Sequence, residues 1–215
     1  MTDLRFKTPF TCIIASPSKS GKSTFVSKLL QNANNMFTSP PSEIYYFYNT
    51  WSPTFDELKR ARVVTDFVKG VCTREWLEDH CSNQPNVTIV LDDQAMNLTK
   101  EVAEIFSVQS HQYNVNCILL AQNLFTKNKF FRDASLNASY IILGKNPRDE
   151  SSIRFLAQQM LPNRSKLLID AYFLATRNPY TFLLLDFCQT TPEMFRLRSN
   201  VFKDNNRPIS IYVAK

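Results

Sequence analysis

The stretch that decides the fold is Phe10-Thr11-Cys12-Ile13-Ile14-Ala15-Ser16-Pro17-Ser18-Lys19-Ser20-Gly21-Lys22-Ser23-Thr24. An apolar run leads into a loop of small residues, which closes with Gly-Lys-Ser-Thr, and a helical pattern follows from Phe25 to Gln31. A strand, a small-residue loop and a helix in this order are typical of a P-loop.

The residues of a P-loop have defined chemical tasks. Backbone N–H groups at the start of the helix face an anion. Lys22 can reach the β- and γ-phosphate oxygens, the Ser23 hydroxyl can ligate Mg²⁺, and Gly21 lets the backbone approach the phosphates without a Cβ. The loop therefore predicts an ATP site with Mg²⁺, formed by Ser18, Lys19, Ser20, Gly21, Lys22, Ser23 and Thr24.

The loop departs from the pattern G-x-x-x-x-G-K-[ST] at its first position, where this chain has Ser16. Serine is small and tolerates turns, but a positive φ costs it energy. A chance Gly-Lys-Ser after a strand is the alternative interpretation, and the loop alone leaves it open.

The composition limits the class of protein. The chain has 215 residues, 44% of them hydrophobic, and no linker or repeat, so we expect one domain over residues 1–215. The net charge of +6 suits a polyanionic partner without requiring one. Five cysteines without a C-x-x-C motif suit a reducing, intracellular compartment. The sequence contains no run of 18 apolar residues, so it predicts no membrane span.

Apolar runs alternate with helical patterns up to about residue 175. This alternation predicts an α/β fold, with a mostly parallel central sheet and helices on both faces, and the strand-rich end of the chain predicts added antiparallel strands. A basic, aromatic connector is expected over 127–132. We expect strands at 11–15, 43–48, 63–64, 86–93, 115–121, 138–143, 180–187, 195–198 and 209–213, and helices at 25–31, 53–60, 73–80, 99–110, 147–160 and 165–176.

Polar side chains end two of these strands. Asp92 follows a buried run and suits the Walker B role, in which a carboxylate meets a water bound to Mg²⁺. Asp93 could polarise the attacking water, and Gln122, at the end of the next strand, could sense the γ-phosphate. The pattern favours hydrolysis over group transfer and predicts that the Gln122 strand lies between the P-loop strand and the Asp92 strand. The alternative is an ordinary strand-to-turn boundary.

Three further segments carry a resemblance to a known family. The segment His111–Phe125, with its Gln-Asn-Leu-Phe end, resembles the signature of viral genome-packaging ATPases. These are poxvirus-type enzymes of the FtsK/HerA superfamily, with a RecA/FtsK-like fold, shared by Polinton-like viruses, adintoviruses and virophages. The segments Arg132–Leu143 and Lys145–Asp149 resemble the next block of that family. Ser16 and Lys19 depart from it, since its members usually carry glycines or small residues there.

The resemblance implies roles and partners. It assigns Lys22, Ser23, Asp92, Asp93 and Gln122 to phosphate, metal, water-activating and sensing tasks. Arg132 is the first candidate, and Arg148 the second, for an arginine finger given to a neighbouring subunit, because γ-phosphate cleavage develops negative charge. The alternative for Arg132 is a contact with DNA phosphates.

The resemblance also implies a motor that packages double-stranded viral DNA. Such a motor would act as a homo-oligomeric ring, pentameric or hexameric, at the portal vertex of a capsid. It would work in an infected cell, either in the nucleus or in a cytoplasmic factory. Basic residues in predicted loops are the candidate DNA contacts: Arg60, Arg62, Lys69, Lys127 and Lys129. Two other functions stay open at this point: a P-loop kinase for nucleotides or related small molecules, and a non-enzymatic nucleotide-binding assembly factor.

Overall fold

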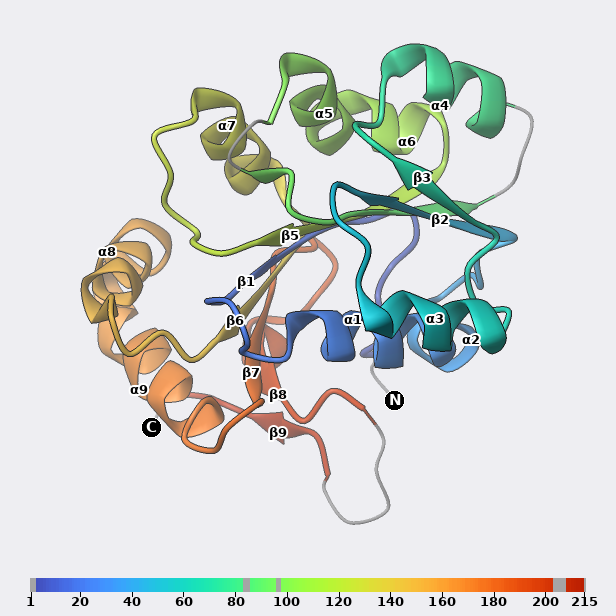
Figure 1. The fold of residues 1–215 in the computed structure, drawn as a ribbon. Coiled ribbons are helices and arrows are strands. Elements are labelled where there is room, and N and C mark those ends of the chain that lie inside the picture. The colour runs from blue at the N-terminus through green and yellow to red at the C-terminus, as the bar shows by residue number, and fades with distance from the viewer. Residues whose placement is uncertain (1–2, 83–85, 96–97, 203–207, 215) are drawn as a thin grey trace.

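The computed structural model describes residues 3–82, 86–95, 98–202 and 208–214. Within these ranges, nine strands form one sheet in the order β3-β2-β4-β5-β1-β6-β7-β8-β9 (Figure 1). The pairs from β3 to β6 are parallel and the last three pairs are antiparallel, as the sequence predicted. The strands are β1 (Thr11–Ala15), β2 (Glu43–Tyr48), β3 (Asp66–Lys69), β4 (Val87–Leu91), β5 (Val115–Ala121), β6 (Tyr140–Gly144), β7 (Phe182–Asp186), β8 (Leu197–Ser199) and β9 (Ser210–Ile211).

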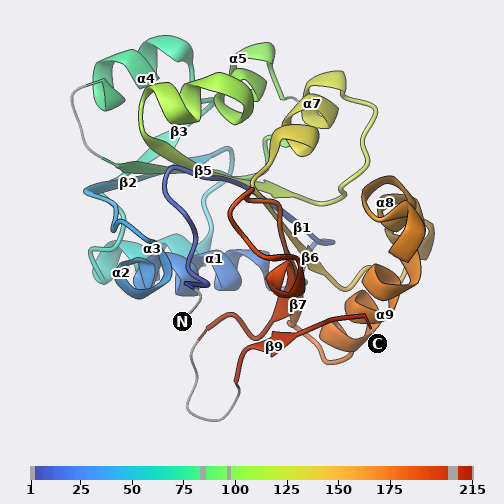
Figure 2. The same cartoon turned by 180° about the vertical axis from the view of Figure 1, so that it is seen from behind.

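Helices cover both faces of the sheet, which Figures 1 and 2 show from opposite sides. The first three helices pack on one face, and the later ones pack on the other face and around the β6–β7 side. No helix in the described ranges is long and apolar enough to cross a bilayer. The helices are α1 (Lys22–Gln31), α2 (Ala33–Met36), α3 (Pro53–Arg60), α4 (Arg74–Cys81), α5 (Lys100–Glu104), the π-helical η2 (Ile105–Gln109), α6 (Ser110–Gln112), α7 (Lys129–Asn137), α8 (Glu150–Met160), the 3₁₀ turn η3 (Pro162–Arg164), α9 (Ser165–Ala175) and the 3₁₀ turn η4 (Glu193–Phe195).

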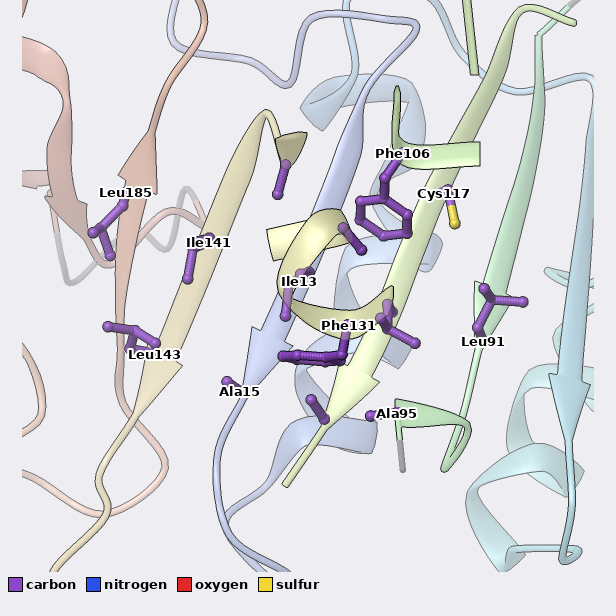
Figure 3. Packing of buried hydrophobic residues seen from close by; sticks show 14 of the residues in the cluster. Ile13, Ala15, Leu91, Ala95, Phe106, Cys117, Phe131, Ile141, Leu143 and Leu185 are labelled. Atoms are coloured by element: carbon purple, nitrogen blue, oxygen red, sulfur yellow. The ribbon is translucent and has the colours of Figure 1, made fainter. Parts of the chain in front are cut away.

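The central strands are buried on both faces, which explains why they read as continuous apolar runs. Successive residues of β1 enter opposite cores: Ile13 packs beneath α7, whereas Ile14 packs against α1. Figure 3 shows the first of these cores, with the rings of Phe106 and Phe131 lying over the strands. Strand β1 is thus enclosed at the centre of the molecule.

The order of the central strands confirms the predicted one, since β5 lies between β1 and β4. Ala15 pairs with Ala121, and Leu91 pairs with Leu119. Because these strands are parallel, their carboxyl ends meet at one edge of the sheet. The loops that follow β1, β4 and β5 therefore leave the sheet side by side.

The predicted edge strand at 63–64 is wrong. Val63 closes the turn after α3, where its N–H donates to the carbonyl of Leu58 at 3.1 Å. The edge strand is β3, which begins at Asp66 opposite Tyr45. A pair of valines was too short a pattern to locate a strand, because the pairing with β2 decides where it begins.

The segment 127–132 is likewise not the predicted connector, because helix α7 begins at Lys129. The Asn128 side chain accepts hydrogen bonds from the N–H groups of Phe130 and Phe131, at 2.9 and 3.2 Å, and so caps the helix. Phe131 and Ala134 turn one face of α7 to the core. The same spacing was visible in the sequence and is typical of a helix.

The P-loop packs tightly against β6. Ser16 continues β1, its side chain is only 2% exposed, and its N–H donates to Ala121 O at 3.1 Å. A Cβ added to Gly144, at the end of β6, would overlap Ser16 Oγ and lie 2.8 Å from both Ser16 Cβ and Phe182 Cε1. Ser16 thus occupies the space that Gly144 leaves free.

We predict that Gly144→Ala lowers the free energy of unfolding by about 1–3 kcal/mol, because the added methyl overpacks this contact. Adding Ser16→Gly removes two of the three overlapping atoms, so the double variant should recover about 1 kcal/mol relative to additivity. Urea unfolding of the four proteins in the cycle measures this coupling. Strict additivity of the two substitutions would refute the proposed contact.

Candidate functional site

A cleft opens at the carboxyl edge of the parallel strands. Its walls come from the loops that follow β1, β2, β4 and β5, together with the first turn of α1. It brings together predicted residues that are as far apart in the sequence as Ser18 and Gln122. The lining residues are Ser18, Lys19, Lys22, Ser23, Tyr48, Asn49, Thr50, Asp92, Asp93, Leu120, Ala121 and Gln122.

The loop after β1 has the backbone of an anion-binding turn. Lys19 and Gly21 both have positive φ, 63° and 90°, and α1 begins at Lys22. The first N–H groups of a helix have no partner within the helix, so those of α1 are free to bind phosphate oxygens. Ser16 is not among the residues with positive φ, and the expected strain at this position is therefore wrong. The left-handed positions are Lys19 and Gly21.

The ammonium of Lys22 lies against the loop itself. It donates hydrogen bonds to the carbonyl oxygens of Ser16 and Pro17, the latter at 2.9 Å. Burial lowers the pKa of Lys22, and the negative charges of Asp92 and Asp93 oppose this shift. A phosphate group near Lys22 would favour its charged form in the same way as the carboxylates do.

The first carboxylate of the pair is held in place by a buried tyrosine. The Tyr46 hydroxyl donates to Asp92 Oδ2 at 2.9 Å, and the Asp92 N–H donates to Phe47 O at 3.0 Å. Burial raises the pKa of Asp92, and the hydrogen bond from Tyr46 opposes this shift. A cation at this position would lower the pKa again, so the carboxylate suits a bound metal ion.

The second carboxylate differs in both conformation and exposure. Asp93 has a φ of 57° and is exposed, and the Asn49 side chain donates to its carbonyl oxygen at 3.1 Å. Few non-glycine residues adopt this backbone, which is often found at functional sites. The turn directs Asp92 and Asp93 into different surroundings within the same cleft.

Several polar groups around the loop have no hydrogen-bond partner in the described part of the chain. The side chains of Ser23 and Gln122 make no hydrogen bond with a described residue, and the hydroxyl of Ser20 is buried without one. No cluster of three or more His, Cys, Asp or Glu side chains in the described ranges could hold a metal ion. Mg²⁺ is commonly held by one or two carboxylates together with phosphate oxygens and water, and Asp92 with Ser23 fits that ligand set.

Some predicted residues lie outside this cleft. Gly21 and Thr24 line an adjoining hollow. Arg132 is exposed on α7, and Arg148 is exposed in the loop between β6 and α8. The candidate DNA contacts do not come from one element and do not all lie in loops as predicted. They end or follow α3, end β3, and precede or begin α7: Arg60, Arg62, Lys69, Lys127 and Lys129.

The sequence did not reveal the contribution of β2. Tyr48, Asn49 and Thr50 line the cleft, and Tyr46 binds Asp92. The available signal was an aromatic strand followed by Asn-Thr, but that signal pointed to the cleft only once the pairing of β2 with β4 was known.

No family model and no curated protein matches the sequence. The genome-packaging NTPase B204 of Sulfolobus turreted icosahedral virus 2, in complex with sulfate, matches the structure with a TM-score of 0.56 at 12% identity, over 98% of this chain and 97% of that chain. Its complex with ATP-γ-S matches with a TM-score of 0.53 at 14% identity, over 95% and 97%.

A secretion protein shares the fold over part of its length. The cytoplasmic domain of the type VII secretion ATPase EccC of Thermomonospora curvata matches with a TM-score of 0.52 at 15% identity, over 85% of this chain and 24% of that chain. The match to B204 instead spans both chains almost completely. The chain therefore has the α/β fold of the P-loop NTPases, as its sequence predicted. The shared fold covers nearly the whole length of both this chain and B204.

Proposed function

We propose that this chain hydrolyses ATP with Mg²⁺ and uses the energy to move double-stranded DNA into a viral capsid. The observation that carries the proposal is the cleft in which Lys22, Ser23, Asp92, Asp93 and Gln122 meet. The near-complete match to a genome-packaging NTPase supports the packaging role over other uses of the same fold. This role belongs in an infected cell, in the nucleus or a cytoplasmic factory.

The residues of the cleft divide the chemistry among them. The N–H groups at the start of α1 and the Lys22 ammonium bind the phosphates. Ser23 and Asp92 would hold Mg²⁺, which neutralises charge on the phosphate oxygens. Asp93 lies at the exposed side, where it can accept a proton from the attacking water. The amide of Gln122, which has no hydrogen-bond partner among the residues that the structure describes, can orient that water.

The active form in this proposal is a ring of five or six copies at the portal vertex of the capsid. Arg132 supports a role in trans, because it is exposed, does not line its own cleft and makes no ion pair with a described residue. An arginine from the next subunit would stabilise the charge that develops during cleavage. Contacts with DNA phosphates would let the ring advance regardless of sequence.

Lys22→Ala should abolish nucleotide binding and lower turnover by about 10²-fold or more, because it removes the cation that contacts the phosphates. Isothermal titration calorimetry with ATP-γ-S and a phosphate-release assay measure the two effects. Lys59→Ala, which removes an exposed lysine of α3, serves as the control. Unchanged ATP-γ-S affinity in Lys22→Ala would show that the loop does not bind the phosphates.

The two carboxylates should fail in different ways. Asp93→Asn should keep nucleotide bound but stop hydrolysis, whereas Asp92→Asn should raise the Mg²⁺ concentration needed for activity. Titrating Mg²⁺ against turnover and against ATP-γ-S affinity separates the two. Asp170→Asn, on the exposed side of α9, is the matched control. An equal loss of nucleotide affinity in both variants would refute this division of roles.

Arg132→Ala should leave ATP binding near normal and reduce turnover by a factor on the order of 10³. Mixed rings of Arg132→Ala and Lys22→Ala subunits should regain activity, because some interfaces then pair an intact P-loop with an intact arginine. The same mixture made with Arg148→Ala tests the second candidate. Mixed rings that regain nothing would contradict action in trans, and normal hydrolysis with lost duplex binding would instead mark Arg132 as a DNA contact.

A further inference from the structure

A second hollow adjoins the P-loop on the side away from β4. It is formed by the first turns of α1, the start of β7 and the segment after β8. Figures 1 and 2 both show β7 beside α1. Lys19, Lys22 and Ser23 line this hollow as well as the phosphate cleft, so the two adjoin at the loop. The other lining residues are Gly21, Thr24, Phe25, Lys28, Tyr180, Phe182 and Phe202.

The floor of the hollow is aromatic. The ring centroid of Phe25 lies 4.8 Å from that of Phe182 and 4.9 Å from that of Phe202. The Lys28 ammonium lies 4.7 Å from the centroid of the Phe202 ring. Beyond the lysines, Ser23 and Thr24, the hollow thus presents flat apolar ring surfaces, which suit a flat, uncharged group better than they suit phosphate.

One residue at the rim combines exposure with an unfavourable backbone. Tyr180 is 72% exposed and has a φ of 60°, a conformation that is uncommon for a bulky residue. Its ring lies over the P-loop, with Cδ1 3.0 Å from the point where a Cβ on Gly21 would sit. The side chain makes no hydrogen bond with a described residue. Neither core packing nor a polar contact explains why the chain holds the ring there.

The geometry points to Tyr180 as the stacking partner of the nucleobase of the bound nucleoside triphosphate. This inference rests on the proposed function. A triphosphate whose γ end faces Asp92 and Asp93 must leave the loop past Gly21 and Thr24, and this path leads into the aromatic hollow. The Tyr180 ring then covers one face of the base, while the ring cluster beneath it excludes water.

Stacking uses the face of the base and not its hydrogen-bonding edge. Every base has such a face, so an aromatic platform is tolerant of base identity. The Tyr180 ring should therefore contribute about equally to the binding of ATP and GTP. It should contribute nothing to the binding of inorganic tripolyphosphate, which has the phosphates without the base.

The test is calorimetric binding of ATP-γ-S and of inorganic tripolyphosphate, with Mg²⁺, to matched variants. Tyr180→Ala should weaken ATP-γ-S binding about tenfold and leave tripolyphosphate binding unchanged. Tyr180→Phe keeps the ring and should match the native protein. Phe155→Ala removes a ring of similar exposure, 62%, on α8 and is the control for loss of a surface aromatic.

The outcomes separate this inference from the proposed function. Native protein that binds neither ligand contradicts both. Native ATP-γ-S affinity in Tyr180→Ala, together with loss of binding in Lys22→Ala, overturns the stacking role and leaves the proposed function standing. An equal loss for both ligands in Tyr180→Ala also overturns it, because the ring would then act by supporting Gly21.

A second measurement covers the case in which Tyr180→Ala fails to fold, which circular dichroism detects. Tyr180→Trp places a fluorophore at the rim while keeping an aromatic surface. Its emission, corrected for the native Trp51 and Trp76, should change on addition of ATP-γ-S and stay constant with tripolyphosphate. An identical response to the two ligands contradicts stacking.

Discussion

The rest of the structure depends on the pairing of β1 with β5 and β6. These parallel ladders hold β1 at the centre of the sheet, and the hydrogen bond from Ser16 N to Ala121 O extends the pairing one residue into the P-loop. The loop is therefore anchored at its first residue, and its turn begins at a defined point. Strand β5 also pairs with β4, and the register of that pairing determines where Asp92 leaves the sheet.

The chemistry of the site follows from the opposite charges of Lys22 and Asp92, which lie near one another in a half-buried cleft. Burial lowers the pKa of Lys22 and raises that of Asp92, and each of these groups opposes the shift of the other. Tyr46 and the loop carbonyl groups supply the fixed hydrogen bonds that orient them. A site of this kind binds ligands with complementary charge, since a phosphate and a metal ion each favour the charged form of one partner.

The single departure from the P-loop pattern has a steric explanation. A serine fits at position 16 because its φ is not positive and because Gly144, on the neighbouring strand, leaves room for its side chain. The left-handed turn is taken by Lys19 and Gly21 instead. With three glycines in the chain, the small residue that this contact requires comes from β6 and not from the loop. A motif read along one segment could not reveal this exchange.

The sequence by itself determined most of the elements and their order along the chain, since buried strands appear as apolar runs and the P-loop as a local pattern, whereas β3 and α7 were not predicted. It also predicted Lys22, Ser23, Asp92, Asp93 and Gln122, because each of them directly follows a recognisable strand or loop. Only the tertiary structure decided which other strands border the cleft. Tyr46 and the end of β2 take part through pairing with β4, and Tyr180 reaches the P-loop from a segment more than 150 residues away. The physical reason is that contacts between distant segments depend on strand pairing and packing, which leave no periodic signal in either segment alone.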